Sequence, residues 1–318
     1  MASTSCTALK VLAASVAVAN RSGTIIRKIL SSGNLGIVEK ENKNDLQTEA
    51  DRAVQRCIVS SLTHQFPQLT IIGEEDNLNE MATADKEYLE TSLAEEVLKE
   101  SCPAEYTEAK ESELVVWVDP LDGTAEFTQG LLDHVTVLIG LAWQGKAIAG
   151  VVYQPYFNYQ TPGAELGRTL WGMIGLGTFG LGNTEPPTEG NIITTTRSHS
   201  NPTVVDSVKA CEPTEVVRVG GAGHKVLLLL DGLVHAYVFG SPGCKKWDTC
   251  APEVLLRAKG GRLTDMHGND LKYHKDVQHK NTGGVLATLK ADHDWYLARI
   301  PESVKQALPE TQVKSATK

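Results

Sequence analysis

The stretch "WVDPLDGT" (residues 117–124) ends an apolar run with two aspartates, Asp119 and Asp122. A turn and a helix cap account for one such acid but leave the other unexplained. Two unit charges about 4 Å apart repel by about 4 kcal/mol at an effective dielectric constant of about 20. A divalent cation removes this repulsion, and Mg²⁺ prefers hard oxygen ligands. We therefore predict a magnesium site at this corner, formed by Asp119, the Leu121 carbonyl oxygen and Asp122.

Three further acids stand in similar contexts. Glu74 follows a strand and a glycine in "IIGEED", Asp248 precedes a helix in "KKWDTCAPEV", and Asp51 lies within the helical segment "TEADRAV". Taken singly, each has a simpler interpretation: a solvated turn for Glu74, a helix cap for Asp248 and an exposed helix acid for Asp51. The order of the four motifs along the chain favours a shared site.

That order resembles the lithium-sensitive, magnesium-dependent phosphatase superfamily, which includes inositol monophosphatase, fructose 1,6-bisphosphatase and the bisphosphate nucleotidases. The motif that carries the resemblance is D-P-[IL]-D-G-T with W-D downstream. Within the superfamily, "DLQTEADR", "IITTTRSHSN", "RVGGAGHK" and "SPGCKKWDTCAPE" are most similar to the 3'(2'),5'-bisphosphate nucleotidases, and the similarity runs from about Val11 to "IPESVK" near the end.

The resemblance implies an α/β fold, a layered αβαβα sandwich of the sugar-phosphatase and inositol monophosphatase type. It also implies hydrolysis of the 3'-phosphate of adenosine 3',5'-bisphosphate to AMP, with the sulfated nucleotide and inositol 1,4-bisphosphate as further candidate substrates and lithium as an inhibitor. Two alternatives stay open: an inositol phosphate phosphatase, and a phosphate sensor without catalytic activity.

By the same resemblance, site residues can be assigned. Asp51 and Thr124 orient and deprotonate the attacking water. Two or three Mg²⁺ ions are held by Glu74, Asp119, the Leu121 carbonyl oxygen, Asp122 and Asp248. The resemblance also implies that Thr196, His199, Gly221 and Lys225 bind the substrate, and the amide of Gly123, at a helix N-terminus, is expected to hold phosphate oxygens. Lys225 is expected to face the second phosphate, and Asp122→Asn is expected to lower turnover without affecting the fold.

Two positions depart from the family's usual residues. Ala125 follows the D-G-T motif where members often have lysine, and His224 precedes Lys225 where members often have asparagine. Neither is a predicted metal ligand. The first change concerns attraction of an anionic substrate, and the second concerns the nucleotide contacts.

Periodicity predicts helices at about 7–31 and 48–65 and strands at 69–76 and 114–120. It also predicts a hairpin that turns at Gln144-Gly145. From about residue 190, strands and helices alternate, which is typical of a layered α/β unit. The Pro- and Gly-rich stretch 182–191 is the expected boundary between an N-terminal α+β lobe (1–185) and a C-terminal α/β lobe (186–318).

The bulk composition narrows the class of protein. The chain has 318 residues, 41% of them hydrophobic, and a formal net charge of −9, which argues against nucleic-acid polymers and anionic membranes as partners. Six scattered cysteines without metal-binding spacing predict reduced thiols and a cytoplasmic location. We interpret 7–31 as a packing helix, with a signal peptide as the alternative. We expect a monomer that binds a small nucleotide bisphosphate.

Overall fold

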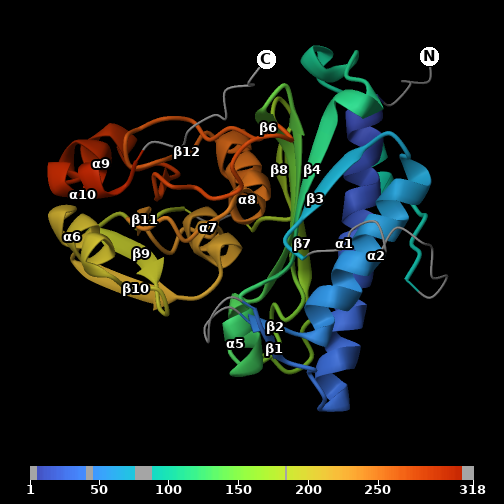
Figure 1. The fold of residues 1–318 in the computed structure, drawn as a ribbon, viewed down its shortest axis with the longest axis horizontal. Coiled ribbons are helices and arrows are strands. Elements are labelled where there is room, and N and C mark those ends of the chain that lie inside the picture. The colour runs from blue at the N-terminus through green and yellow to red at the C-terminus, as the bar shows by residue number, and fades with distance from the viewer. Residues whose placement is uncertain (1–5, 41–45, 76–87, 183–184, 310–318) are drawn as a thin grey trace.

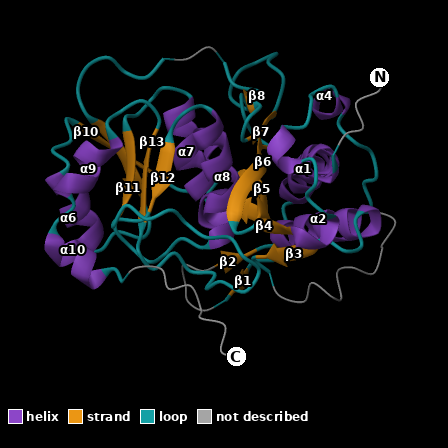
Figure 2. Ribbon diagram, turned by 90° about the horizontal axis from the view of Figure 1, so that it is seen from above, coloured by secondary structure: helices purple, strands orange, loops and turns teal. Residues whose placement is uncertain are grey.

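The structure, a computed structural model, describes residues 6–40, 46–75, 88–182 and 185–309. It is a five-layered αβαβα sandwich, as predicted (Figures 1 and 2). From one side to the other, a helical pair covers a six-stranded sheet, a second helical pair fills the centre, and helices cover the outer face of a five-stranded sheet. The helices of these layers are, in that order, α1 (Thr7–Ser32) and α2 (Glu49–Gln65), α7 (Ala222–Leu230) and α8 (Lys246–Ala258), then α6 (Pro202–Ala210), α9 (His293–Arg299) and α10 (Glu302–Ala307).

The six-stranded sheet has the order β3-β4-β5-β6-β7-β8. Its strands are β3 (Thr70–Gly73), β4 (Leu114–Asp122), β5 (Thr136–Trp143), β6 (Lys146–Gln154), β7 (Arg168–Met173) and β8 (Gly177–Phe179). β3 runs parallel to β4, and the other neighbours are antiparallel. The predicted hairpin is confirmed: β5 and β6 turn at Gln144 and Gly145, both with positive φ (51° and 75°). A turn of this kind matches the natural twist of two antiparallel strands.

The five-stranded sheet has the order β10-β9-β11-β13-β12. Its strands are β9 (Ile192–Thr196), β10 (Glu215–Val219), β11 (Ala236–Phe239), β12 (Arg262–Thr264) and β13 (Val285–Thr288). The predicted alternation of strand and helix is confirmed, and it makes β10, β9 and β11 parallel. In the sequence, the strands of the six-stranded sheet all precede residue 180 and those of the five-stranded sheet all follow residue 191. In space, however, α7 and α8 each contact strands of both sheets. The division into lobes at 185/186 stays a prediction.

Short elements complete the described chain. They are β1 (Val38–Glu39), β2 (Leu46–Gln47), α4 (Glu95–Leu98), α5 (Thr124–Thr128) and the 3₁₀ turns η1 (Ala104–Tyr106), η2 (Glu111–Glu113) and η3 (Leu132–His134). β1 and β2 form a small antiparallel hairpin, and β2 contacts α5. Residues of β2 and α5 line the candidate site described below.

Helix α1 is a core element. By length and mean hydropathy (1.2) it is the one helix among the described residues that could cross a membrane, yet 72% of the relevant window is buried within the fold. It packs against α2 and β6. Contact with β6 is so close that a Cβ at Gly23 would lie 2.1 Å from Cε1 of Tyr153. The packing-helix interpretation therefore fits this structure.

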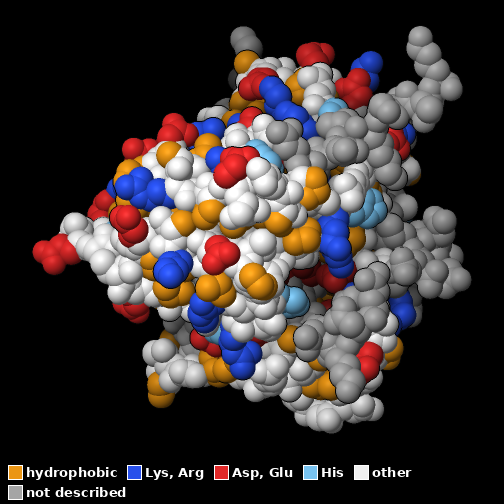
Figure 3. All heavy atoms as spheres, turned by 60° about the vertical axis from the view of Figure 1, so that its left-hand side comes forward, with side chains coloured by type: hydrophobic (Ala, Val, Ile, Leu, Met, Phe, Trp, Pro, Cys, Tyr) orange, Lys and Arg blue, Asp and Glu red, His pale blue; other side chains and the backbone are white. Residues whose placement is uncertain are grey.

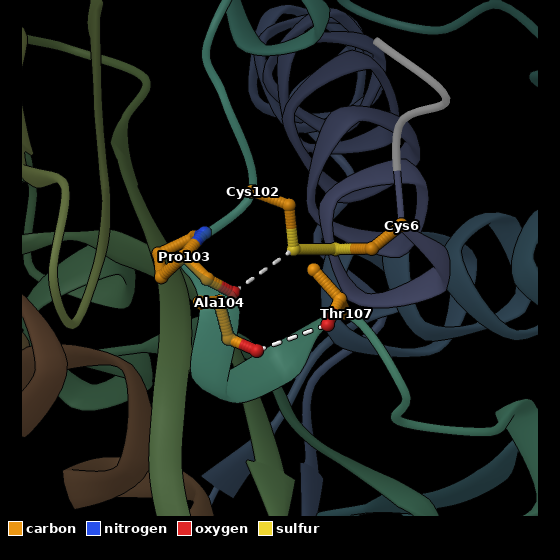
Figure 4. The surroundings of a disulfide bond; sticks show 5 residues. All are labelled: Cys6, Cys102, Pro103, Ala104 and Thr107. Carbon is orange, nitrogen blue, oxygen red and sulfur yellow. Dashed lines mark hydrogen bonds between the residues drawn. A yellow bond between two sulfur atoms is a disulfide. The ribbon is translucent and has the colours of Figure 1, made fainter.

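The cysteine prediction is wrong for one pair. Cys6, directly before α1, forms a disulfide with Cys102, in the segment between α4 and η1, with the two Cα atoms 6.0 Å apart (Figure 4). The partners are 96 residues apart in sequence, so spacing alone could not reveal them. They meet because α1 packs against α4. Among the described residues, the remaining cysteines are buried free thiols: Cys57, Cys211, Cys244 and Cys250.

Candidate active site

The "DPLD" corner is an irregularity at the end of β4. Pairing with β5 is regular up to Asp119 and shifts register before Asp122. The Asp119 side chain folds back and accepts a hydrogen bond from the Leu121 amide (3.0 Å). Pro120 lacks an amide hydrogen, so the bulge interrupts the ladder without leaving a backbone donor unpaired at this residue. The bulge changes the direction of the Asp119 and Asp122 side chains at the end of a strand that is buried along its whole length.

Asp122 has a role that sequence reasoning missed. Its two carboxylate oxygens accept hydrogen bonds from the amides of Ala222 and Gly223 (both 2.8 Å), and one of them also accepts from the Thr136 hydroxyl (2.7 Å). Those amides belong to the first turn of α7, where the helix dipole is positive. Asp122 therefore fastens α7 to the six-stranded sheet. The expectation that its charge serves metal binding alone, and that Asp122→Asn leaves the fold unaffected, is incomplete.

The other predicted acidic ligands line a common cavity, with Asp119 buried and Glu74 and Asp248 partly buried. Burial, together with the charges of Glu74, Asp122 and Asp248, raises the pKa of Asp119 well above its ordinary value. Burial and the charges of Glu74 and Asp122 raise the pKa of Asp248 to about 7. The Asp248 carboxylate also accepts a hydrogen bond from the Lys245 amide (2.7 Å) at the start of α8. Asp119 and Asp248 are each disfavoured as anions because burial removes water from the carboxylate and because its neighbours carry the same charge.

The donor set fits a hard divalent cation. It consists of carboxylates and one backbone carbonyl, all oxygen, which is the set that Mg²⁺ prefers. Among the described residues, however, no group of three such side chains is close enough together to hold a metal ion as they are now placed. Two of these side chains have partners within the protein: Asp122 accepts from the Ala222 amide of α7, and Glu74 accepts from the ammonium of Lys40 (3.0 Å). Lys40 also pairs with Glu75 (2.8 Å).

Asp51 and Thr124 meet although 73 residues separate them. The Thr124 hydroxyl lies 3.0 Å from an Asp51 carboxylate oxygen and 3.0 Å from the Leu121 carbonyl. The other Asp51 oxygen accepts from the Thr48 amide (2.8 Å) in the capping box of α2. Asp51 is fully buried, and burial raises its pKa to about 7. The structure thus presents an acid–hydroxyl pair at the corner, with a carboxylate that titrates near neutrality.

All predicted site residues except Asp51, which reaches it through Thr124, line one cavity of about 340 Å³. Figure 3 shows acidic atoms at the bottom of a recess, with basic and histidine atoms at its rim. Segments distant in sequence contribute to it: the residues just after β3 and β10, the end of β4, the end of β9 with the loop that follows, and the starts of α7 and α8. The individual roles of these residues stay predictions.

The predicted substrate residues lie on the loops after the parallel strands. The hydroxyl of Thr196, the last residue of β9, accepts from the His199 amide (3.0 Å), which shapes the loop. Gly221 has φ +69°, and a Cβ there would lie 2.6 Å from the His134 carbonyl oxygen, so a glycine is required. Lys225 is buried, and its ammonium donates to the Gly221 carbonyl (2.9 Å).

The two departures from the family's usual residues occupy different places. Ala125 lines the cavity. His224 instead stacks on His134, with the ring centroids 4.9 Å apart, and its Nδ1 is buried without a hydrogen-bond partner among the described residues. Burial lowers the pKa of His224 to about 3, which keeps the ring neutral.

Sequence reasoning missed Glu126. This acid is only 3% exposed, lines the cavity and forms an ion pair with Arg197 (3.4 Å). Arg197 also donates to the Gln129 side chain (2.9 Å), so it joins α5 to the loop after β9. A cue was available in the sequence, since Glu126 lies two positions after the end of the D-G-T motif. A lone acid in a short helix, however, reads as solvated without tertiary information.

The fold and the acidic pocket together define a class of protein. The family model for the inositol monophosphatase family matches residues 8–305, and the chain belongs to this family. Solved structures agree on the fold: the extragenic suppressor protein suhB from Bartonella henselae superposes with a TM-score of 0.65 at 20% identity, over 91% of this chain and 97% of that one.

Sequence relatives point to a particular member of the class. The chain is 58% identical to the 3'(2'),5'-bisphosphate nucleotidase 1 of Homo sapiens over 309 residues, which is 97% of this chain and 99% of that protein. Similarity to the Golgi-resident adenosine 3',5'-bisphosphate 3'-phosphatase of Bos taurus is lower, at 29% identity over 93% of this chain and 82% of that protein.

Proposed function

We propose that this chain is a magnesium-dependent phosphomonoesterase that removes the 3'-phosphate of adenosine 3',5'-bisphosphate, giving AMP and phosphate. The observation that carries the proposal is the contact between Asp51 and Thr124 at the edge of the cavity lined by the predicted metal and substrate residues. The 58% identity to a bisphosphate nucleotidase over nearly the full length supports the choice of substrate.

Magnesium would be held by Glu74, Asp119, the Leu121 carbonyl, Asp122 and Asp248. When bound, Mg²⁺ neutralises charge on the transferred phosphate and on the leaving oxygen. The crystal structure of an IMPase/NADP phosphatase complexed with Mg²⁺ and phosphate superposes on this chain with a TM-score of 0.64 at 18% sequence identity. We propose two or three ions, because the four carboxylates together carry more negative charge than one divalent cation offsets.

Asp51 and Thr124 supply the proton acceptor. With the Thr124 hydroxyl donating to ionised Asp51, the lone pairs of the threonine oxygen are free to accept a proton from an attacking water. Burial places the pKa of Asp51 at about 7, so the carboxylate can take up a proton and lose it again near neutral pH. Thr48 and the α2 cap hold the carboxylate in position.

The test is a phosphate-release assay on a substrate panel, with and without Mg²⁺. We expect release from adenosine 3',5'-bisphosphate to exceed release from inositol 1,4-bisphosphate and inositol monophosphates, and to stop in the presence of a chelator. Faster release from the inositol phosphates would favour the inositol phosphatase alternative. Phosphate binding without release from any compound would favour the sensor.

Location and oligomeric state are also proposals. We propose a monomer in the cytoplasm, and the buried free thiols among the described residues support the cytoplasmic location. The Cys6–Cys102 bond argues the other way, because disulfides are rare in reducing compartments. Cell fractionation with non-reducing electrophoresis tests the location and the bond together, and light scattering gives the mass in solution.

A further inference from the structure

Two glycine turns of the cavity meet at one residue, His134. The turns stand at helix starts, Gly123 before α5 and Gly221 before α7, and both glycines have positive φ and line the cavity. A Cβ added at Gly123 would lie 3.1 Å from the His134 carbonyl oxygen, and one added at Gly221 would lie 2.6 Å from the same atom. The carbonyl of His134 therefore packs between the two turns, which only glycines can approach so closely.

The His134 side chain holds the second turn by a hydrogen bond. The Gly220 amide donates to Nδ1 of the ring (3.2 Å), although 86 residues separate the two. Gly220 is buried, so loss of this acceptor would leave its amide without a partner away from water. A ring nitrogen that accepts carries no hydrogen, which places the ring hydrogen on Nε2, 4.0 Å from the Asp133 carboxylate.

The same ring also lies flat against α7. It stacks on His224, in the first turn of that helix, with the ring centroids 4.9 Å apart and the planes at 21°. The stack uses the face of the ring, whereas the hydrogen bond uses its Nδ1 edge. The two contacts can therefore be removed one at a time by substitution.

Asp122 anchors the other side of the same turn. It accepts hydrogen bonds from the amides of Ala222 and Gly223 (both 2.8 Å). Gly221 thus lies between residues that are both fastened to the six-stranded sheet. The Lys225 ammonium donates to the Gly221 carbonyl (2.9 Å), so a shift of the turn would carry this lysine with it. A turn held on both sides presents a fixed geometry before a ligand arrives.

We propose that His134 is a positioning residue that holds the Gly220-Gly221 turn at a fixed distance from Gly123, and so sets the spacing between the reacting phosphate and a second phosphate of the substrate. This inference rests on the proposed function and on the predicted roles of Gly123 and Lys225, which face the reacting and the second phosphate. Substrates with two phosphates should depend on the His134 acceptor, and substrates with the reacting phosphate alone should not.

Three substitutions separate the acceptor from the ring. His134→Phe keeps a ring for the stack but has no acceptor. His134→Asn loses the ring but carries a side-chain oxygen that can take the place of Nδ1. His134→Ala removes both groups without adding bulk. The matched control is the same set of substitutions at His64, an exposed histidine outside the cavity.

The kinetic test compares two substrates that differ only in the second phosphate: adenosine 3',5'-bisphosphate and adenosine 3'-monophosphate. For His134→Phe and His134→Ala we expect KM for the bisphosphate to rise about tenfold, because the turn loses its acceptor. His134→Asn should keep this KM near the wild-type value. We expect kcat for the bisphosphate, and KM for the monophosphate, to stay near the wild-type values in all three variants. A purely structural role of the histidine would affect both substrates alike.

Binding without turnover provides an independent measurement. Calorimetry with AMP, which keeps only the 5'-phosphate, should show about tenfold weaker binding in His134→Phe and normal binding in His134→Asn. Adenosine binding should be unchanged in both variants. Thermal unfolding checks that the variants are folded, and His134→Ala replaces His134→Phe in every comparison if the larger ring prevents folding.

Three results would each overturn the proposal: equal losses on the two substrates, an unchanged KM in both His134→Phe and His134→Ala, or a loss in His134→Asn as large as in His134→Phe. If the wild-type protein releases no phosphate from the bisphosphate, the proposed function fails. The comparison of AMP with adenosine still tests the positioning role of His134 in that case.

Discussion

The two sheets contribute opposite kinds of group to one cavity. The six-stranded sheet supplies acids at the ends of buried strands, Asp119 and Asp122 above all. The five-stranded sheet supplies loops after parallel strands, with hydroxyls, glycines and backbone amides. Acids that repel one another need a rigid, dry frame to stay together, whereas substrate recognition tolerates exposed loops. We call the six-stranded sheet and the helices packed on it the packed side, and the five-stranded sheet with its loops the looped side. The comparison indicates that the packed side carries the residues for the chemical step and the looped side those for substrate specificity.

The largest effect should come from disabling the packed side. We expect Asp51→Asn and Thr124→Val each to lower kcat by about 10²- to 10⁴-fold, because each removes the proton acceptor of the attacking water. The double variant should be little worse than either single variant, since the two residues act as a unit. Steady-state kinetics on adenosine 3',5'-bisphosphate check this. Multiplicative losses would show that the two residues act separately.

Next in size is the disulfide, which belongs to the packed side alone. Removing it as Cys6→Ser with Cys102→Ser should lower the free energy of unfolding by about 2–4 kcal/mol, because the bond closes a long loop. Since neither cysteine lines the cavity, kcat at 25 °C should be unchanged. Chemical denaturation measures the loss. A reductant should reproduce it in the wild-type protein and have no effect on the variant.

Asp119 and Asp122 should respond differently to the same substitution. In metal-free buffer, Asp122→Asn should lose about 1–3 kcal/mol of stability, because an amide cannot accept all the hydrogen bonds from α7 and Thr136. Asp119→Asn should be neutral or stabilising, because it removes a buried charge among like charges. Both should lose activity. Equal melting temperatures for the two variants would refute the role of Asp122 as the fastening of α7.

The smallest effect concerns the looped side and pH. His293 is buried, and its ring nitrogens lie 2.9 and 3.0 Å from the hydroxyls of Thr264 and Thr288. Burial, with Arg262 nearby, lowers the pKa of His293 to about 4, below the ordinary value of 6.5. The unfolded chain therefore binds a proton between these pH values while the folded chain does not, so stability falls as pH drops from 6.5 toward 4.

Urea denaturation between pH 7 and 5 tests this expectation. His293→Gln should flatten the decline, whereas substitution of the exposed His64 should leave it in place. The contribution of one histidine is bounded by about 1.4 kcal/mol per pH unit. An unchanged slope in His293→Gln would show that other groups cause the decline.

Local patterns predicted the elements well. The helical spacing of α2, the hairpin at Gln144-Gly145 and the alternation after residue 190 are confirmed because each depends on neighbours within a few residues. The acidic stretch 77–112 gives only short helical turns where it is described, and residues 76–87 lie outside the described part. The cysteine prediction failed because a bond between residues 96 positions apart leaves no local signal.

By itself, the sequence determined which residues could do the chemistry. "DPLDGT", the glutamate after β3 and the aspartate of "WD" carry ligand oxygens whose identity does not depend on folding. Only the tertiary structure decided how they are used. It brought Thr124 to Asp51, turned Asp122 toward α7, and set His134 against the turns before α5 and α7. The physical reason is that repulsion, burial and hydrogen bonding act over a few ångströms of space, whatever the distance along the chain.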